Sequence, residues 1–180
     1  RKEGIGLTRT KGFVEGAVAE QVMAYILYFA RRVDLQSADM HDHCWNSRLM
    51  PGAKNHTIGL VGFGGIGTEV AKRAVPFGMK VIYFCRHPNP ADDAAYGVQS
   101  VSMEELLKES DYVVAVDVFP KEPCTNSVLT RYANALLTPH SATSTAENSK
   151  ATNFAAANNL VNYLKKDIDA KYVVVQGTRY

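Results

Sequence analysis

Apolar residues along this chain fall into short continuous runs and into stripes with helical spacing. The runs at residues 57–61, 79–84 and 111–116 are bounded by polar or turn residues, and they predict buried parallel strands. Helical spacing over residues 13–32 and 145–166 predicts two long helices. Between the strands, the pattern predicts short helices at 68–77, where Pro76 would end the helix, and at 102–109, where S-x-x-E forms a capping box.

The stripe on the first helix is wider than one core face needs. Residues spaced three and four apart form it, and further large apolar residues flank it: Val18, Val22, Ile26, Phe29 and Val33, with Met23, Tyr25, Leu27 and Tyr28 beside them. Either a dimer interface or burial on two sides within one domain would use this extra surface. Residues 33–50 predict a second, more polar helix, and 91–97 predict a connecting segment before a short strand at 98–101.

A glycine motif lies between the first buried strand and the helix that follows it. Gly62, Gly64 and Gly67 have the spacing G-x-G-x-x-G inside a strand–helix–strand unit. The first glycine permits a tight turn, the second lets a pyrophosphate approach the backbone, and the third lets the helix pack closely on the strand. Together with Gly65 and Ile66, these residues predict a dinucleotide site at a helix N-terminus. A glycine-rich turn that binds nothing is the weaker alternative.

The end of the next strand decides which dinucleotide fits. An acidic residue about 20 positions after the glycines binds the ribose 2′-hydroxyl of NAD in this architecture. Cys85 stands in that place here, followed by Arg86 and His87, which could hold a 2′-phosphate instead. We therefore expect NADP or NAD as cofactor, with NADP favoured. The alternative is that Arg86 is only a solvated loop charge.

The succession of elements predicts the α/β class, with a Rossmann-type doubly wound parallel sheet and an N-terminal helical arm. We expect residues 1–50 to form the N-terminal segment and arm, 51–145 the dinucleotide-binding core, and 146–180 a C-terminal helix and tail.

Composition and charge exclude several classes of protein. A net charge of +2 gives no field for nucleic acid, and the longest apolar run, at 22–30, is too short to span a membrane. Three separated cysteines and no recognisable signal peptide suit a reduced, cytoplasmic protein. The cluster at residues 41–44 contains two histidines and a cysteine, but residues two apart on a helix do not share a face, so we expect no metal site.

Four blocks resemble the D-isomer-specific 2-hydroxyacid dehydrogenases. They are the V-A-E helix ending in A-R-R at 16–32, V-G-F-G-G-I-G with its helix and F-G-M-K-V at 61–81, D-V-F-P-K-E-P at 117–123, and L-L-T-P-H-S-A-T-S-T at 136–145. The resemblance implies that His140 is the general acid/base, that Glu122 pairs with it and raises its pKa, and that Asp117 contacts the nicotinamide side of the cofactor.

The chain also departs from the family pattern, so we expect either a sheet truncated relative to the family or a sequence that covers only parts of a longer chain. An N-terminal substrate domain has no counterpart, and Val116 runs straight into Asp117, where the family carries a helix, a strand ending in N-x-x-R-G and another helix. No residue here matches the arginine of that motif, which grips the substrate carboxylate.

The leading hypothesis is therefore an NAD(P)-dependent oxidoreductase that converts a 2-oxo acid of the glyoxylate or hydroxypyruvate class to a D-2-hydroxy acid. We expect a homodimer with a small-molecule substrate and no nucleic acid or membrane partner. A cofactor-binding remnant or regulatory protein without turnover is the alternative, and a dimerisation module built on residues 13–32 is the weakest.

The reaction expected of that oxidoreductase is the reversible reduction of a 2-oxo acid of the glyoxylate or hydroxypyruvate class by NADPH or NADH.

Overall fold

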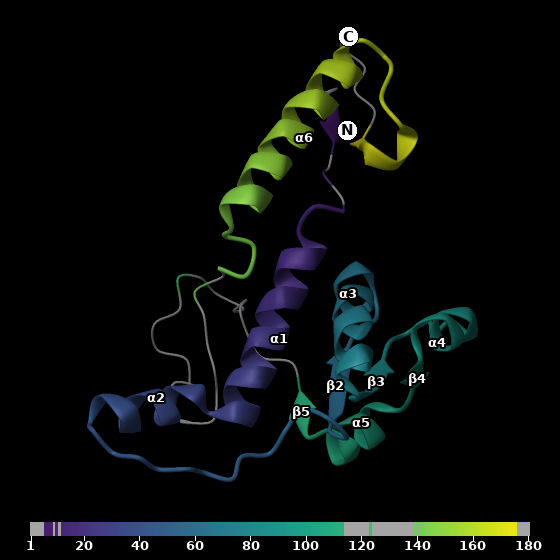
Figure 1. Ribbon diagram of the computed structural model, residues 1–180. Coiled ribbons are helices and arrows are strands. Elements are labelled where there is room, and N and C mark those ends of the chain that lie inside the picture. Colours follow the sequence, from purple (N-terminus) through teal and green to yellow (C-terminus); the bar gives the residue numbers. More distant parts are fainter. Residues whose placement is uncertain are drawn as a thin grey trace. The chain divides into compact units, whose positions relative to one another are not determined.

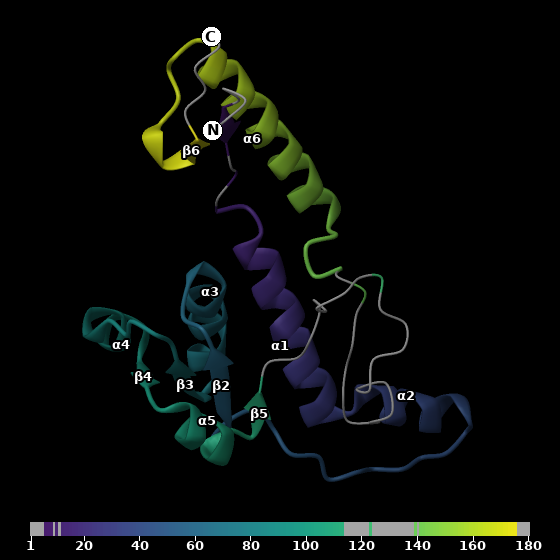
Figure 2. The same ribbon diagram turned by 180° about the vertical axis from the view of Figure 1, so that it is seen from behind.

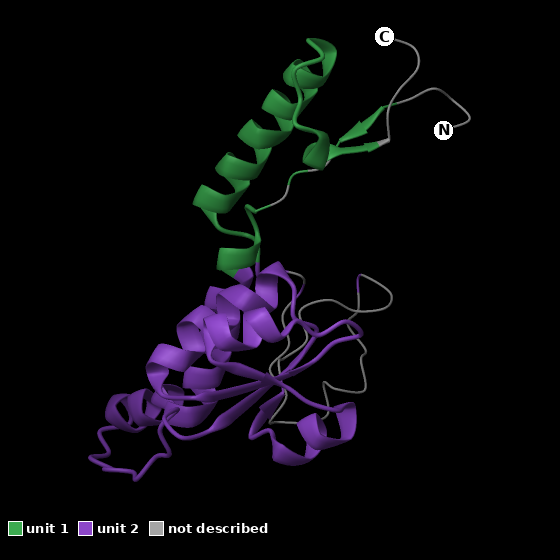
Figure 3. Ribbon diagram, turned by 90° about the vertical axis from the view of Figure 1, so that its right-hand side faces the viewer, with its two compact units in different colours: residues 1–17, 143–180 green, residues 18–142 purple. Residues whose placement is uncertain are grey.

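The computed structural model describes residues 6–8, 10, 12–113, 123, 139 and 141–175 of the 180-residue chain. The chain divides into two compact units, residues 18–142 and residues 1–17 with 143–180 (Figure 3). Each unit is described below by itself. The three-part division at residues 50 and 145 stays a prediction.

The larger unit is built on a sheet of four parallel strands. In the order β4-β3-β2-β5 they are Val98–Ser100, Lys80–Phe84, Thr57–Val61 and Tyr112–Val113. Within this unit, α4 (Pro90–Tyr96) lies at the β4 edge and β5 at the opposite edge (Figures 1 and 2). The strand order reverses direction after β4, which confirms the predicted Rossmann-type sheet. The predicted extension of β5 to residue 116 lies outside the described residues.

Two helices cover one face of this sheet. They are α1 (Glu15–Arg31) and α3 (Gly65–Ala74), and their buried residues join alternate strand positions in one core cluster. Because side chains on a strand point alternately to its two faces, Ile58 and Leu60 enter this cluster while Gly59 faces the other way. The cluster comprises Ala19, Val22, Met23, Ile26, Ala53, Ile58, Leu60, Val70, Ala71, Ala74, Met79, Val81, Tyr83 and Val98.

A short helix packs on the opposite face. Helix α5 (Met103–Glu109) buries Leu106 completely, and a side chain at Gly59 would collide with Leu106 and Ser110. The absence of a side chain at Gly59 therefore lets α5 approach β2. The Ser102 hydroxyl accepts a hydrogen bond from the Glu105 backbone N–H, as the capping box predicted.

Three sequence predictions need correction in this unit. Residues 91–97 are not a connecting segment, because α4 forms there with Asn89 as its cap, Pro90 at its first position and Gly97 in the left-handed conformation after it. Helix α2 (Val33–His41) ends nine residues before the predicted limit of 50. Helix α3 begins at Gly65 instead of residue 68, so the third motif glycine, Gly67, belongs to the helix.

The early end of α2 has a local cause. The helix buries none of its residues, so it has no apolar face to hold it against the core. His43 adopts a positive φ of 59°, and Arg48 then forms an ion pair of 2.7 Å with Asp39, drawing the chain back beside the helix. After α3, a 3₁₀ turn (Val75–Phe77) contains Pro76, where the sequence predicted the helix to end.

The smaller unit contains α6 (Ala146–Leu164), the 3₁₀ turn η3 (Ala170–Tyr172), and a two-stranded antiparallel sheet of β1 (Leu7–Thr8) and β6 (Val173–Val175). Thr145 caps α6, its hydroxyl accepting a hydrogen bond from the Asn148 backbone N–H. The apolar side predicted for this helix is exposed, with Phe154 at 69%, whereas Asn159 is buried.

A charged pair fixes the corner between α1 and α2. Arg32 adopts the left-handed conformation, with φ 42°, and its guanidinium forms an ion pair of 2.9 Å with Asp34. The Tyr28 hydroxyl also donates to Asp34, at 3.1 Å. Hydrogen bonding from Arg32 is the main reason that the pKa of Asp34 falls from 3.8 to about 2.

We expect Arg32→Met to raise the pKa of Asp34 toward 3.8, measured by NMR titration of its carboxyl group. Because the folded-state pKa is depressed, the stabilisation from this pair is present above about pH 4 and is lost as the pH falls through about 2. The difference in unfolding free energy between wild type and variant should therefore shrink over that interval. Tyr28→Phe is the matched control and should raise the pKa less, and an unchanged Asp34 pKa in Arg32→Met would contradict the assignment.

Candidate functional site

The glycine turn at the end of β2 has an open backbone. Gly62 has φ 102°, and its N–H donates to the Phe84 carbonyl at 2.7 Å, which ties the turn to the end of β3. A Cβ placed at Gly62 or Gly64 would have no atom within 4 Å. The backbone at both positions is therefore open to the close approach of a ligand.

Gly67 is confined where the other two glycines are open. A Cβ there would lie 3.0 Å from the Gly62 carbonyl oxygen and 3.3 Å from the Phe63 ring. Any larger residue would push the first turn of α3 away from the end of β2. The three positions thus have the separate duties that a phosphate-binding turn requires: a turn with positive φ, an open approach and a close contact.

Helix α3 begins directly at this turn. Gly64 is its N-cap, and the Thr68 N–H makes a hydrogen bond of 2.9 Å to the Gly64 carbonyl. The N–H groups of the first turn have no partner within a helix, and the helix dipole adds positive potential there. The first turn contains no acidic residue that would oppose an anion.

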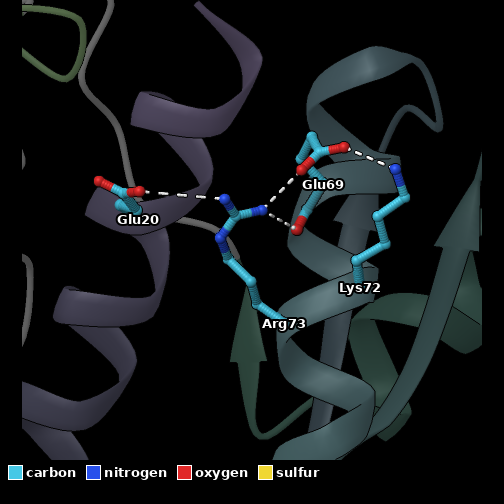
Figure 4. A network of polar contacts seen from close by, with 4 residues as sticks. All are labelled: Glu20, Glu69, Lys72 and Arg73. Carbon is cyan, nitrogen blue, oxygen red and sulfur yellow. Dashed lines mark hydrogen bonds and ion pairs between the residues drawn. The ribbon is translucent and has the colours of Figure 1, made fainter. Parts of the chain in front are cut away.

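The first carboxylate of α3 is neutralised by two cations. Glu69 forms ion pairs of 2.7 Å with both Lys72 and Arg73, and Arg73 also reaches Glu20 of α1 at 3.9 Å (Figure 4). Hydrogen bonds from Lys72 and Arg73 lower the pKa of Glu69, so the group is ionised but compensated at neutral pH. Its charge therefore opposes anion binding at the turn only weakly.

The end of β3 lies beside the glycine turn. Phe84 pairs with Val61, so the segment after Phe84 leaves the sheet at the same carboxyl edge as the turn. Cys85 is half-buried, and Arg86 and His87 are exposed. In the part of the chain that the structure describes, neither Arg86 nor His87 forms an ion pair. The seven described residues of the predicted cofactor site therefore follow the carboxyl ends of two paired strands: Gly62, Gly64, Gly65, Ile66 and Gly67 follow β2, and Arg86 and His87 follow β3.

An aromatic cluster under the turn escaped the sequence analysis. The rings of Phe63 and Tyr83 are stacked, with centroids 4.3 Å apart, and Tyr96 lies 6.2 Å from Phe63. The Tyr83 hydroxyl donates to Asp93 Oδ1 at 2.6 Å. Burial and the neighbouring Asp93 carboxylate raise the pKa of Tyr83, so it remains a neutral donor. The sequence feature that could have indicated this cluster was Phe63, an aromatic residue between the first two motif glycines.

The predicted catalytic residues cannot be placed in the same way. Glu122 and His140 lie outside the described residues, and so does Asp117, the remaining residue of the predicted cofactor site. Within the described residues, no group of three or more histidine, cysteine, aspartate or glutamate side chains could hold a metal ion. No helix in the described ranges has the length and apolar character needed to cross a membrane.

Comparison with known proteins identifies the family. Residues 23–116 match the model of the D-isomer specific 2-hydroxyacid dehydrogenase NAD binding domain. The chain belongs to this family. The matched range contains the C-terminal half of α1, the glycine turn and every strand of the parallel sheet.

Its relatives include reductases of two substrates. A glyoxylate reductase of Thermococcus litoralis is 28% identical over 96% of this chain and 71% of its own length. A hydroxypyruvate reductase of Thermotoga maritima is 35% identical over 63% of this chain, and a glyoxylate reductase of Thermococcus kodakarensis is 36% identical over 67%. The match spans only 37% and 39% of the lengths of these last two relatives.

Solved structures share the fold. A 2-hydroxyacid dehydrogenase from Ketogulonicigenium vulgare superposes with a TM-score of 0.82 at 20% identity, covering 99% of this chain and 73% of that one. A D-lactate dehydrogenase from Aquifex aeolicus, solved with NAD and lactic acid, gives 0.81 at 19% identity, covering 98% and 75%. At these identities the likeness establishes the architecture alone.

The open backbone at the turn generates a prediction. Gly64 has φ −111°, which alanine adopts readily, so Gly64→Ala should change the unfolding free energy by less than about 0.5 kcal/mol. A methyl group should nonetheless obstruct a bound pyrophosphate and weaken dinucleotide binding about tenfold or more. Denaturant unfolding and calorimetric titration measure the two effects. Gly62→Ala is the contrast, because its positive φ should cost about 1–3 kcal/mol of stability as well. Undiminished dinucleotide binding by Gly64→Ala would contradict this use of the turn.

Proposed function

We propose that this chain forms the coenzyme-binding part of an enzyme that reversibly reduces a 2-oxo acid of the glyoxylate or hydroxypyruvate class to a D-2-hydroxy acid. The observation that carries the proposal is the open glycine turn at the start of α3, in a chain of the 2-hydroxyacid dehydrogenase family. The names of its relatives, glyoxylate reductase and hydroxypyruvate reductase, support this substrate class.

The residues divide the chemistry between binding and proton transfer. A nicotinamide cofactor supplies the hydride when bound. The backbone of Gly62, Gly64 and the first turn of α3 holds the pyrophosphate, and the compensated Glu69 opposes the helix dipole only weakly. By family resemblance, His140 gives a proton to the carbonyl oxygen of the substrate and Glu122 keeps that histidine protonated. Asp117 orients the nicotinamide side in the same proposal.

For the cofactor, the proposal favours NADP(H) over NAD(H). Cys85 stands where a carboxylate would bind the ribose 2′-hydroxyl, and its neighbour Arg86 is exposed with no ion pair in the described part of the chain. Asp93, a carboxylate close by in sequence, is committed to the Tyr83 hydroxyl. The charge at the end of β3 therefore suits a 2′-phosphate better than a hydroxyl group.

A binding protein without turnover is the second candidate. The alignment with the Thermococcus litoralis reductase runs over 234 positions, more than the 180 residues of this chain, so that relative contains internal residues without a counterpart here. No residue of this sequence matches the family's carboxylate-gripping arginine. If that function is missing, the chain would bind the cofactor and leave it unchanged.

Cofactor titration and turnover separate these proposals. We expect NADPH to bind more tightly than NADH, and Arg86→Ala to weaken NADPH binding about tenfold or more by removing a charge-assisted hydrogen bond to phosphate. NADH binding by Arg86→Ala should stay nearly unchanged and serves as the internal control. Tighter binding of NADH by the wild type would contradict the preference. Oxidation of NADPH with glyoxylate or hydroxypyruvate supports the enzyme, and binding without oxidation supports the second candidate.

We also propose that the chain forms a homodimer through the segment that follows α2. Trp45 is 86% exposed and Leu49 is fully exposed, and Val33 and Met40 are exposed on α2 nearby in sequence. Large apolar side chains exposed this close together in sequence suit a surface that another chain covers. A second copy is the occupant that the family resemblance implies.

Light scattering tests the dimer. We expect a mass near twice the 19.8 kDa of one chain, and a shift toward 19.8 kDa when Trp45 and Leu49 are both replaced by serine. Phe154→Ser, at an exposed apolar position on α6, is the control and should leave the mass unchanged. A wild-type mass of 19.8 kDa would contradict the proposal.

A further inference from the structure

Tyr83 connects two parts of the nucleotide site that are separate in sequence. It is buried in β3, with 1% of its surface exposed, and its ring stacks on Phe63 between the first two glycines. Its hydroxyl reaches the other way and donates to Asp93 in α4 at 2.6 Å. One side chain thus contacts both the pyrophosphate turn and the helix that follows the specificity loop, residues 85–89.

The bond between Tyr83 and Asp93 closes the specificity loop at its base. The two residues are ten positions apart, and Cys85, Arg86 and His87 lie between them. The backbone N–H of Asn89, at the far end of the loop, also interacts with the Tyr83 oxygen, which partly offsets the rise in its pKa. Asn89 in turn accepts from the Ala91 N–H with its side chain, so the end of the loop and the start of α4 are fixed together.

Arg86 and His87 have no comparable anchors of their own. Both are exposed, and within the described residues neither forms an ion pair. Their approach to a ligand therefore depends on the backbone of the loop that carries them. If only a fraction of molecules holds this loop in the right conformation, the apparent affinity for a ligand that needs the loop falls by that fraction.

The two contacts of Tyr83 serve different parts of the cofactor. The stack on Phe63 supports the turn that holds the pyrophosphate, which NADPH and NADH share. The bond to Asp93 supports the loop that faces the ribose 2′ position, where the two cofactors differ. Loss of the Tyr83 hydroxyl alone should therefore change the preference for NADPH over NADH more than it changes the affinity for both cofactors.

We propose that Tyr83 is a positioning residue for cofactor choice: its hydrogen bond to Asp93 holds residues 85–89 in the conformation that presents Arg86 and His87 to the 2′-phosphate of NADP(H). This inference rests on the proposed preference for NADP(H). It adds to that proposal a buried residue that touches no part of the cofactor and acts through the loop.

The test uses four variants of the full chain. Tyr83→Phe and Asp93→Ala remove the bond from either side, while Asp93→Asn keeps an oxygen acceptor for the hydroxyl and is the conservative rescue. Phe63→Leu disturbs the shared turn and is the matched control. Calorimetric titration gives the dissociation constants for NADPH and NADH, and hydrogen exchange of the cofactor-free chain reports on the amides of residues 85–87 and 89.

We expect Tyr83→Phe and Asp93→Ala each to weaken NADPH binding about tenfold and NADH binding less than about twofold, as for a loop whose competent fraction falls to about a tenth. Exchange at residues 85–89 should accelerate in both variants without any cofactor. The double variant should resemble either single one, because both remove the same bond. Asp93→Asn should retain the wild-type preference for NADPH, and Phe63→Leu should weaken the binding of both cofactors by the same factor.

Other results would overturn the inference. Equal weakening of NADPH and NADH binding by Tyr83→Phe would mean that the hydroxyl only stabilises the fold, and unchanged affinity for both cofactors would mean that the loop does not depend on it. An Asp93→Asn variant that behaves like Asp93→Ala would exclude the hydrogen bond as the cause. These failures differ from failure of the proposed function, which would already be visible in a wild type that prefers NADH or binds neither cofactor.

Discussion

The close contact between the start of α3 and the end of β2 sets the geometry of the whole nucleotide site. Only 3.0 Å would separate a Cβ at Gly67 from the Gly62 carbonyl, so the helix approaches the strand as closely as it does because Gly67 has no side chain. That approach places the N–H groups of the first helical turn over the carboxyl edge of the sheet. Parallel pairing of β2 with β3 then brings the specificity loop to the same edge.

Charge at this edge is arranged locally. The net charge of the chain is only +2, so no general field draws an anion to the turn. The positive character comes from the N-terminus of α3 and from Arg86, while two carboxylates of this unit are engaged: Glu69 by Lys72 and Arg73, and Asp93 by Tyr83. Compensation of these carboxylates matters as much as the placement of the cations. An uncompensated carboxylate would repel a bound phosphate as strongly as a cation at the same distance attracts it.

The sequence predicted those features that depend on neighbouring residues. Strand β2 and the glycine turn were predictable because continuous apolar residues and G-x-G-x-x-G each have a local physical cause. Helix α4 was missed, although Asn89, Pro90 and Gly97 are ordinary helix-boundary residues, because seven residues give no clear periodicity. The bond from Tyr83 to Asp93 joins a strand to a helix, and no pattern in the sequence predicts such a pairing.

Helix α6 illustrates a different limit. Its apolar residues predicted an amphipathic helix, and the helix forms, yet Phe154, Leu160 and Leu164 are exposed while Asn159 is buried. Periodicity indicates that a face favours burial, but it does not identify what covers that face. The pattern therefore predicted the helix correctly. It gave no basis for predicting which of its residues would be buried.

Cofactor binding and turnover depend on different stretches of this chain. Everything proposed to hold the nucleotide, apart from Asp117, lies between β2 and α4, where hydrogen bonds and packing within one β–α–β unit fix it. The proposed proton donor and its partner, His140 and Glu122, come from later segments, and the grip on the substrate carboxylate matches no residue here. Loss of the later functions would leave the turn and the specificity loop intact. Tight cofactor binding is therefore expected of both the reductase and its inactive counterpart, and only consumption of the cofactor distinguishes them.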